Sequence, residues 1–131
     1  NDVSSIVIGY NQGWKNEINM GKKNNQNFVN IPYEKLINFI HYKAEENGIR
    51  VIMVKEGYTS KCSSLDKEEI RKHETYVGKR VKRGLFKTSV GLEINADVNG
   101  SLNILRKVIE DGFIDLLNIG CVLQPELVKV I

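Results

Sequence analysis

The tract YEKLINFIHYKAEENGIRVIMV, residues 33–54, joins a helical pattern to a strand pattern. Its first part places apolar side chains at the spacing of one helix face: Tyr33, Leu36, Ile37, Ile40 and Ala44. Gly48 is a typical helix stop. The run IRVIMV at residues 49–54 is apolar and β-branched, which predicts a strand.

A second apolar run lies upstream, where SIVIG at residues 5–9 ends in a glycine and predicts another buried strand. Residues 11–30 are rich in Asn, Lys and Gly and favour a loop. A strand, a crossover helix and a strand form a βαβ unit, whose two strands are normally parallel neighbours. The sequence therefore predicts an α/β fold.

Regular patterning is lost between residues 59 and 94. KEEIRKHE at residues 67–74 is helix-like, and VKRGLFKTSVGLEI at residues 81–94 predicts a loose hairpin around its glycines. Basic residues gather here, and Tyr76 or Phe86 is available for stacking, so the segment is a candidate nucleic-acid contact. Its candidate residues are Arg71, Lys72, Lys79, Arg80, Lys82, Arg83 and Lys87. An ordinary solvated loop is the alternative.

Helical spacing returns after Asp97, with Val98, Leu102, Leu105 and Ile109 on one face. An acid that opens such a helix can point across the strand ends of an α/β sheet, where these folds place their sites. Alternatively, Asp97 only stabilises the positive end of the helix. Residues 112–131 predict a short helix, to which we assign no function.

Composition restricts the partners. The 131 residues are enough for one domain, and a formal charge of +3 requires any nucleic-acid partner to meet a local basic patch. No apolar run is long enough to cross a membrane, the start is not a signal peptide, and two cysteines make no disulfide framework. We therefore expect a cytoplasmic protein without a membrane partner. The absence of an initiator Met predicts a piece of a longer polypeptide.

Three motifs resemble, in order, those of the TnpB (OrfB) family of transposon-encoded proteins and the related type V CRISPR effectors. Residues 95–104, NADVNGSLNI, resemble that family's D-R-D-x-N-A-A-x-N-I signature. Residues 58–63, YTSKCS, resemble its Y-T-S-x-x-C-S element and are one residue shorter. Residues 33–54 resemble the helix and strand that precede it. The similarity covers roughly residues 5–109.

The resemblance implies a partial RNase H-like (RuvC) fold with parallel strands, a crossover helix and a degenerate zinc-ribbon insertion. Residues 1–58 would be the βαβ part of the core, 59–94 a basic insertion in place of the ribbon, and 95–131 the C-terminal helix and tail. The implied activity is RNA-guided cutting of DNA, associated with transposition, with two Mg²⁺ ions held by three acids. The expected partners are DNA and a guide RNA in a prokaryotic cytoplasm.

The acids match only in part. Asp97 matches the third acid of the family, whereas Gly9 stands where the second acid ends a strand. Because adjacent parallel strands end at one sheet edge, we expect Glu56, just after the neighbouring strand, to replace it as a Mg²⁺ ligand; a solvated loop carboxylate is the alternative. The first acid would lie upstream of residue 1, so the chain alone is expected to be inactive. A degenerate, non-catalytic nucleic-acid-binding module is the rival function.

The family's zinc ribbon is also degenerate. The resemblance matches Cys62 with its first ligand but puts Leu65, Lys87 and Val90 at the other three positions. His73 would bring the count of ligands only to two, too few for structural zinc. We therefore expect no zinc, and we expect the insertion to be mobile without it.

Overall fold

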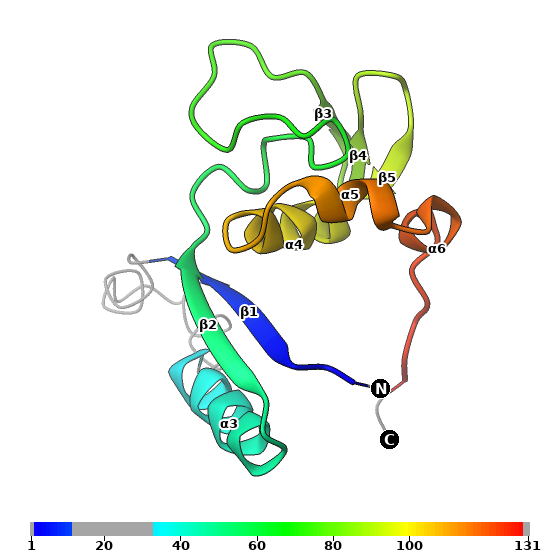
Figure 1. The fold of residues 1–131 in the computed structure, drawn as a ribbon. Coiled ribbons are helices and arrows are strands. Elements are labelled where there is room, and N and C mark those ends of the chain that lie inside the picture. Colours follow the sequence, from blue (N-terminus) through cyan, green and yellow to red (C-terminus); the bar gives the residue numbers. More distant parts are fainter. Residues whose placement is uncertain (1, 12–32, 130–131) are drawn as a thin grey trace, which may run out of the picture. The chain divides into compact units, whose positions relative to one another are not determined.

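The computed structural model of the chain describes residues 2–11 and 33–129 (Figure 1). Most of the loop predicted at residues 11–30 lies outside the described residues. The chain divides into two compact units, Asn1–Lys55 and Glu56–Ile131, which are described separately. No helix in the described part is long and apolar enough to cross a membrane.

The first unit contains β1 (Ser5–Tyr10), α3 (Tyr33–Glu46) and β2 (Arg50–Lys55). The two strands pair in parallel, from Ser5 opposite Arg50 to Tyr10 opposite Lys55, so the predicted parallel pair is confirmed (Figure 1). Both strands end at the last pair of this register, Tyr10 and Lys55. Glu56 is therefore the first residue after the shared end of the strands.

The predicted face of α3 is correct in part. Ala44 is buried and Ile37 and Ile40 are half-buried, but Leu36 is 52% exposed. The helix ends where the amides of Asn47 and Gly48 bind carbonyls of the last turn, and Gly48 has a φ of +66°. That left-handed conformation favours glycine and explains the predicted stop.

The second unit contains a three-stranded antiparallel sheet and three helices. The strands β3 (Lys79–Lys82), β4 (Leu85–Lys87) and β5 (Glu93–Asn95) lie in that order, so the predicted hairpin is confirmed and extended by a strand. The sheet leads directly into α4 (Ala96–Arg106), which is followed by α5 (Gly112–Leu116) and α6 (Ile119–Leu123) (Figure 1). The tail thus has two short helices where one was predicted, and Ile109 lies beyond the end of α4.

The core of the second unit lies between its sheet and helices. Phe86, Ile94 and Ala96 form the buried cluster, against which pack side chains of α4 and α6 and one of the loop: Val98, Leu102, Val122, Leu123 and Leu65. Gly78 permits this packing, because a Cβ there would stand 2.6 Å from the Phe86 ring. Phe86 is 1% exposed and cannot stack on a base, contrary to one expectation from the sequence.

The helix predicted at residues 67–74 is absent, and this prediction was wrong. These residues form turns and bends, and Lys67 takes a left-handed φ of +53° that interrupts any helix. Arg71 pairs with Glu69, two positions away, at 2.8 Å, an arrangement that a helix does not allow. Side-chain contacts therefore replace the helical hydrogen bonds in this segment.

Candidate functional site

Asp97 opens α4 with a free side chain. The helix is capped by Asn95, whose side-chain oxygen accepts the amides of Asp97 (2.9 Å) and Val98 (3.1 Å). Asp97 is exposed, and none of the described residues forms a hydrogen bond or ion pair with its carboxylate. Because the Asn95 side chain already caps the helix, the Asp97 side chain is not needed as a cap. Its carboxylate is available to a ligand.

Glu56 lies at the start of the second unit and is half-buried. Its carbonyl accepts hydrogen bonds from the amide of Thr59 at 3.1 Å and from the Thr59 hydroxyl at 2.6 Å. These bonds fix the backbone at Glu56. Its carboxylate forms no ion pair with the described residues.

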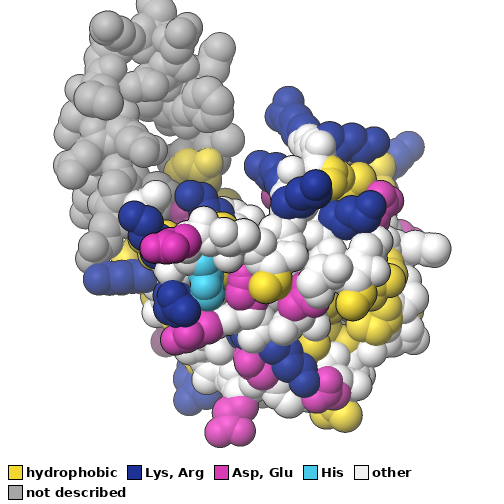
Figure 2. All heavy atoms as spheres, turned by 90° about the horizontal axis from the view of Figure 1, so that it is seen from above, with side chains coloured by type: hydrophobic (Ala, Val, Ile, Leu, Met, Phe, Trp, Pro, Cys, Tyr) yellow, Lys and Arg dark blue, Asp and Glu magenta, His cyan; other side chains and the backbone are white. Residues whose placement is uncertain are grey.

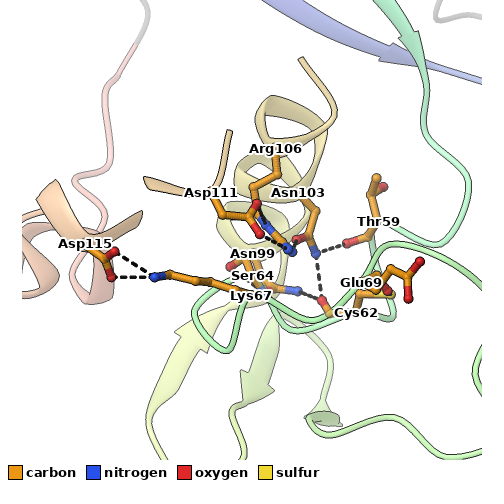
Figure 3. Close-up of polar contacts among 10 residues, drawn as sticks. All are labelled: Thr59, Cys62, Ser64, Lys67, Glu69, Asn99, Asn103, Arg106, Asp111 and Asp115. Atoms are coloured by element: carbon orange, nitrogen blue, oxygen red, sulfur yellow. Dashed lines mark hydrogen bonds and ion pairs between the residues drawn. The ribbon is translucent and has the colours of Figure 1, made fainter. Parts of the chain in front are cut away.

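Two buried asparagines of α4 hold the loop at residues 59–64 (Figure 3). The amide nitrogen of Asn99 donates to the Cys62 carbonyl at 2.9 Å, and its oxygen accepts from the Ser64 amide (2.9 Å) and hydroxyl (2.8 Å). Asn103 donates to the carbonyls of Thr59 (2.8 Å) and Cys62 (2.7 Å). Both side chains are fully buried. We call this arrangement the asparagine clamp.

The clamp is braced from the other side by Arg106. Its guanidinium donates to the Asn103 oxygen at 2.8 Å and forms two bonds with the Asp111 carboxylate, at 2.7 and 3.0 Å (Figure 3). The hydrogen bond from Arg106 lowers the pKa of Asp111. Both N–H donors of the Asn103 amide are thereby used, and its oxygen accepts one hydrogen bond. The Y-T-S-like segment and the helix that carries Asp97 form one hydrogen-bonded assembly.

A second cross-link joins the loop to the turn after β4. The Asp66 carboxylate accepts the Ser63 hydroxyl (2.5 Å), the Ser89 amide (2.9 Å) and the Ser89 hydroxyl. Burial opposes ionisation of Asp66, but these hydrogen bonds outweigh it and lower its pKa. Together with the asparagine clamp, they tie down a segment that the sequence predicts to be mobile. Its mobility itself stays a prediction.

We expect the second unit to lose stability in acid through Asp66. A carboxylate whose pKa is lower in the folded chain stabilises the fold above its unfolded pKa, about 3.9, and this contribution is lost as the pH falls through the folded value. Asp66→Asn should therefore reduce the free energy of unfolding at pH 7, and the difference from wild type should shrink below about pH 4. Urea unfolding across this pH range measures it. Asp115→Asn, an exposed partner of Lys67, is the control and should change little.

The structure brings most of the basic candidates together on the hairpin. Lys79, Arg80, Lys82 and Arg83 are exposed, and Lys87 is half-buried. On the face that Figure 2 shows, Lys and Arg side chains gather on one projecting part. A bulge between Arg80 and Lys82 interrupts the pairing of β3 with β4. We call Lys79, Arg80, Lys82, Arg83 and Lys87 the basic hairpin.

The other two basic candidates lie outside the basic hairpin. Arg71 and Lys72 are exposed in the preceding loop, and Arg71 is engaged by Glu69. Tyr76 is half-buried, with its ring against the edge of His73 at 5.3 Å between centroids. The aromatic expected for stacking is therefore in contact with another ring.

Three positions match zinc ligands of the family's ribbon but carry other residues here, and the structure places them in three different environments. Leu65 packs against the core, Lys87 pairs with Lys79 across the sheet, and Val90 is 78% exposed. The Cys62 thiol is buried and donates weakly to the carbonyls of Glu69 and Arg71. Burial raises the pKa of Cys62.

Several residues of the site carry no role in the sequence-based interpretation. Asn99 and Asn103 fall within the quoted motif, and their spacing of four places both on one helix face. Polar residues at that spacing in an apolar helix are a usable signal for a buried clamp. Asp66 and Glu68 sit in a charged run and give no such signal.

Comparisons with known proteins agree on one family. Residues 33–104 match the family model described as Cas12f1-like, TNB domain. The chain is similar to the TnpB-like protein ORF457 of Acidianus two-tailed virus, 34% identical over 109 residues that cover 82% of this chain and 21% of that protein. It is also similar to the CRISPR-associated endodeoxyribonuclease Cas12f1 of Sulfoacidibacillus thermotolerans, 38% identical over 80 residues, or 57% of this chain and 17% of that protein.

The chain thus spans about a fifth of the length of these relatives. No solved structure gives a significant match.

Proposed function

This chain belongs to the Cas12f1-like TNB-domain family, among TnpB-type proteins related to type V CRISPR effectors, and on that premise we propose that it is part of a RuvC-like DNA endonuclease with an RNase H fold. The observation that carries the proposal is Asp97, an exposed carboxylate at the start of α4 whose capping duty is taken by Asn95. In this proposal the partners are DNA and a guide RNA.

Glu56 is the second proposed ligand. The register places Gly9 opposite Val54 in the parallel pair, and Glu56 directly follows the end of that neighbouring strand at Lys55. In this proposal Glu56, which follows the neighbouring strand, replaces the acid that is missing at Gly9.

The donors fit a magnesium site, because Mg²⁺ is a hard ion that prefers carboxylate oxygens. Asp97 and Glu56 would hold it. When bound, the ion supplies positive charge for the attack of water and for the leaving oxygen of a phosphodiester. The chain's own contribution is positional: Asn95 fixes the first turn of α4, and the asparagine clamp holds that helix to the loop just after Glu56.

The test of this proposal is DNA cleavage by the longest natural polypeptide that contains residues 1–131. We expect cleavage that requires Mg²⁺ and stops when EDTA removes the ion. Residues 1–131 alone should cut slowly, because the first acid of the family's set has no match in them. Equal cleavage in EDTA and Mg²⁺ would contradict the proposal.

A non-catalytic nucleic-acid-binding module is the second candidate, favoured by Gly9 at the place of an acid. Both candidates use the basic hairpin. Lys79 lies directly opposite Lys87, a like-charge pair that destabilises a sheet unless an anion compensates it. A pocket of about 330 Å³ opens beside these lysines and is also lined by Thr88 and Ser89. These features support a phosphate contact here.

Replacing Arg80, Lys82 and Arg83 together with alanine should weaken DNA binding regardless of sequence. Each lost phosphate contact reduces the slope of log affinity against log salt by about 0.7–0.9, so the triple variant should lose about 2–3 units of slope. Fluorescence anisotropy of labelled DNA at several salt concentrations measures this.

The charge-matched control replaces Lys35, Lys43 and Lys129, exposed lysines that are remote from the hairpin in the sequence. An equal change of slope in both triple variants would mean that net charge, and not the basic hairpin, sets the affinity.

A further inference from the structure

Three side chains of different chemistry converge in the loop between Cys62 and Val77. The sulfur of Cys62, a carboxylate oxygen of Glu68 and a ring nitrogen of His73 all lie within 4.8 Å of one another. Within the described residues this is the one group of at least three Cys, His, Asp or Glu side chains so arranged. Cys62 and Glu68 are buried, and His73 is half-buried.

The backbone brings these residues together. Lys67 takes its left-handed conformation at a turn in which its amide binds the Ser64 carbonyl and the Glu68 amide binds the Ser63 carbonyl. The turn reverses the chain and returns Glu68 toward Cys62. The asparagine clamp fixes the backbone at Cys62, because the side chains of Asn99 and Asn103 both donate to the Cys62 carbonyl.

Glu68 is a buried acid with little compensation. It is 7% exposed, and among the described residues its carboxylate accepts only the Val77 amide, at 3.2 and 3.4 Å. In the described part of the chain no Lys or Arg forms an ion pair with it. A buried carboxylate without a cationic partner is costly, and a bound metal ion would supply the missing charge.

His73 contributes one ring nitrogen to the cluster, and a hydrogen bond orients its ring. Its Nε2 lies 2.6 Å from the Glu69 carbonyl oxygen, which can only accept, so Nε2 carries the proton and donates. In the neutral ring the other nitrogen, Nδ1, keeps its lone pair. Metal-bound histidines usually hold their second ring nitrogen in this way, by donating to a carbonyl or carboxylate.

We propose that Cys62, Glu68 and His73 form a three-ligand site for a zinc-like divalent ion with an open fourth position. Thiolate, imidazole and carboxylate together suit Zn²⁺ or Co²⁺, and not Mg²⁺. Bonds of about 2.0–2.3 Å require ligand atoms about 3.3–3.8 Å apart, so the present spacing needs only a small contraction. On binding, the thiol hydrogen leaves as a proton to solvent and the sulfur bonds the ion.

This site differs from the four-cysteine ribbon that the family resemblance implies. Only Cys62 is shared, whereas Glu68 and His73 are ligands of this chain's own. Counting Cys62 and His73 alone predicted no zinc, because the sequence does not indicate that Glu68 folds back to them. A closed four-ligand site is structural, while three ligands leave room for water or another small donor.

Cobalt titration of the full chain under reducing conditions tests the site. At one equivalent of Co²⁺ we expect a near-ultraviolet thiolate-to-cobalt band and visible bands of four-coordinate intensity. Cys62→Ser should abolish the thiolate band, and Glu68→Gln and His73→Asn should each weaken Co²⁺ binding at least about tenfold. Zn²⁺ should displace the cobalt.

The matched control is Cys121→Ser, because Cys121 is exposed and remote from the cluster in the sequence; it should leave the spectrum unchanged. Glu68→Gln keeps the shape of the side chain, and circular dichroism establishes that each variant is folded. Absence of the thiolate band in the wild type, its loss in Cys121→Ser, or affinity unchanged by both Glu68→Gln and His73→Asn would overturn the site. The readout does not involve cleavage, so its failure leaves the proposed nuclease standing.

Discussion

Replacing Asp97 with asparagine should slow Mg²⁺-dependent DNA cleavage about a hundredfold or more in the longest natural polypeptide that contains this chain. Amide oxygen is a poorer ligand than carboxylate for a hard cation, and the charge lost is the one that holds the ion. Charge stabilisation by such an ion contributes several kcal/mol, and each 1.4 kcal/mol corresponds to about a tenfold change of rate. Single-turnover cleavage at saturating DNA measures the change.

The same substitution should leave the fold nearly intact. Asp97 is exposed, and its carboxylate forms no hydrogen bond or ion pair with the described residues, so its contribution to the free energy of unfolding is that of an acid at a helix start, about 0.3–1 kcal/mol. Glu110→Gln, an exposed acid after the end of α4, is the matched control and should cut at the wild-type rate. Comparable losses in both variants would remove Asp97 from the site.

Replacing Asn99 with alanine should destabilise the second unit by about 2–6 kcal/mol. The substitution leaves the buried amide and hydroxyl of Ser64 without their acceptor, and each unsatisfied buried group costs about 1–3 kcal/mol. The Cys62 carbonyl is affected less, because Asn103 also donates to it. Urea unfolding followed by circular dichroism measures the loss in the free energy of unfolding.

A local measurement separates loss of the clamp from general destabilisation. The Ser64 amide should exchange its hydrogen with solvent much faster in Asn99→Ala than in wild type, because its bond to Asn99 is gone. Asn118→Ala, which removes only a long 3.4 Å bond to the Cys121 amide at the surface, is the control and should cost less than about 1 kcal/mol. Equal losses of unfolding free energy in the two variants would show that the asparagine clamp does not stabilise the second unit more than a surface hydrogen bond does.

The local patterns predicted the elements well where hydrophobic spacing alone determines them. The apolar runs at residues 5–9 and 49–54 are strands, and they pair in parallel as a crossover helix requires. The helix after Asn95 begins where the signature places it, with Asp97 in its first turn. These features depend on residues that are close together in the sequence, so the local pattern is sufficient to predict them.

Turn conformations and contacts between side chains account for what the sequence did not reveal. The helical pattern at residues 67–74 is overridden by the left-handed Lys67 and by the pairing of Arg71 with Glu69. Phe86 is buried by the arrival of Ile94 and Gly78 beside it. Glu68 reaches Cys62 only because a turn reverses the chain. None of these contacts has a signature in composition or periodicity.

A double-mutant cycle on Asp97 and Glu56 tests most directly whether the two acids share one cation. Cleavage rates are compared for wild type, Asp97→Asn, Glu56→Gln and the double variant, each at saturating Mg²⁺. If one ion binds both carboxylates, each single change removes its function, and the double variant should cut no more than about threefold more slowly than the slower single variant. Losses that multiply, or a Glu56→Gln variant that cuts at the wild-type rate, would contradict a shared ion.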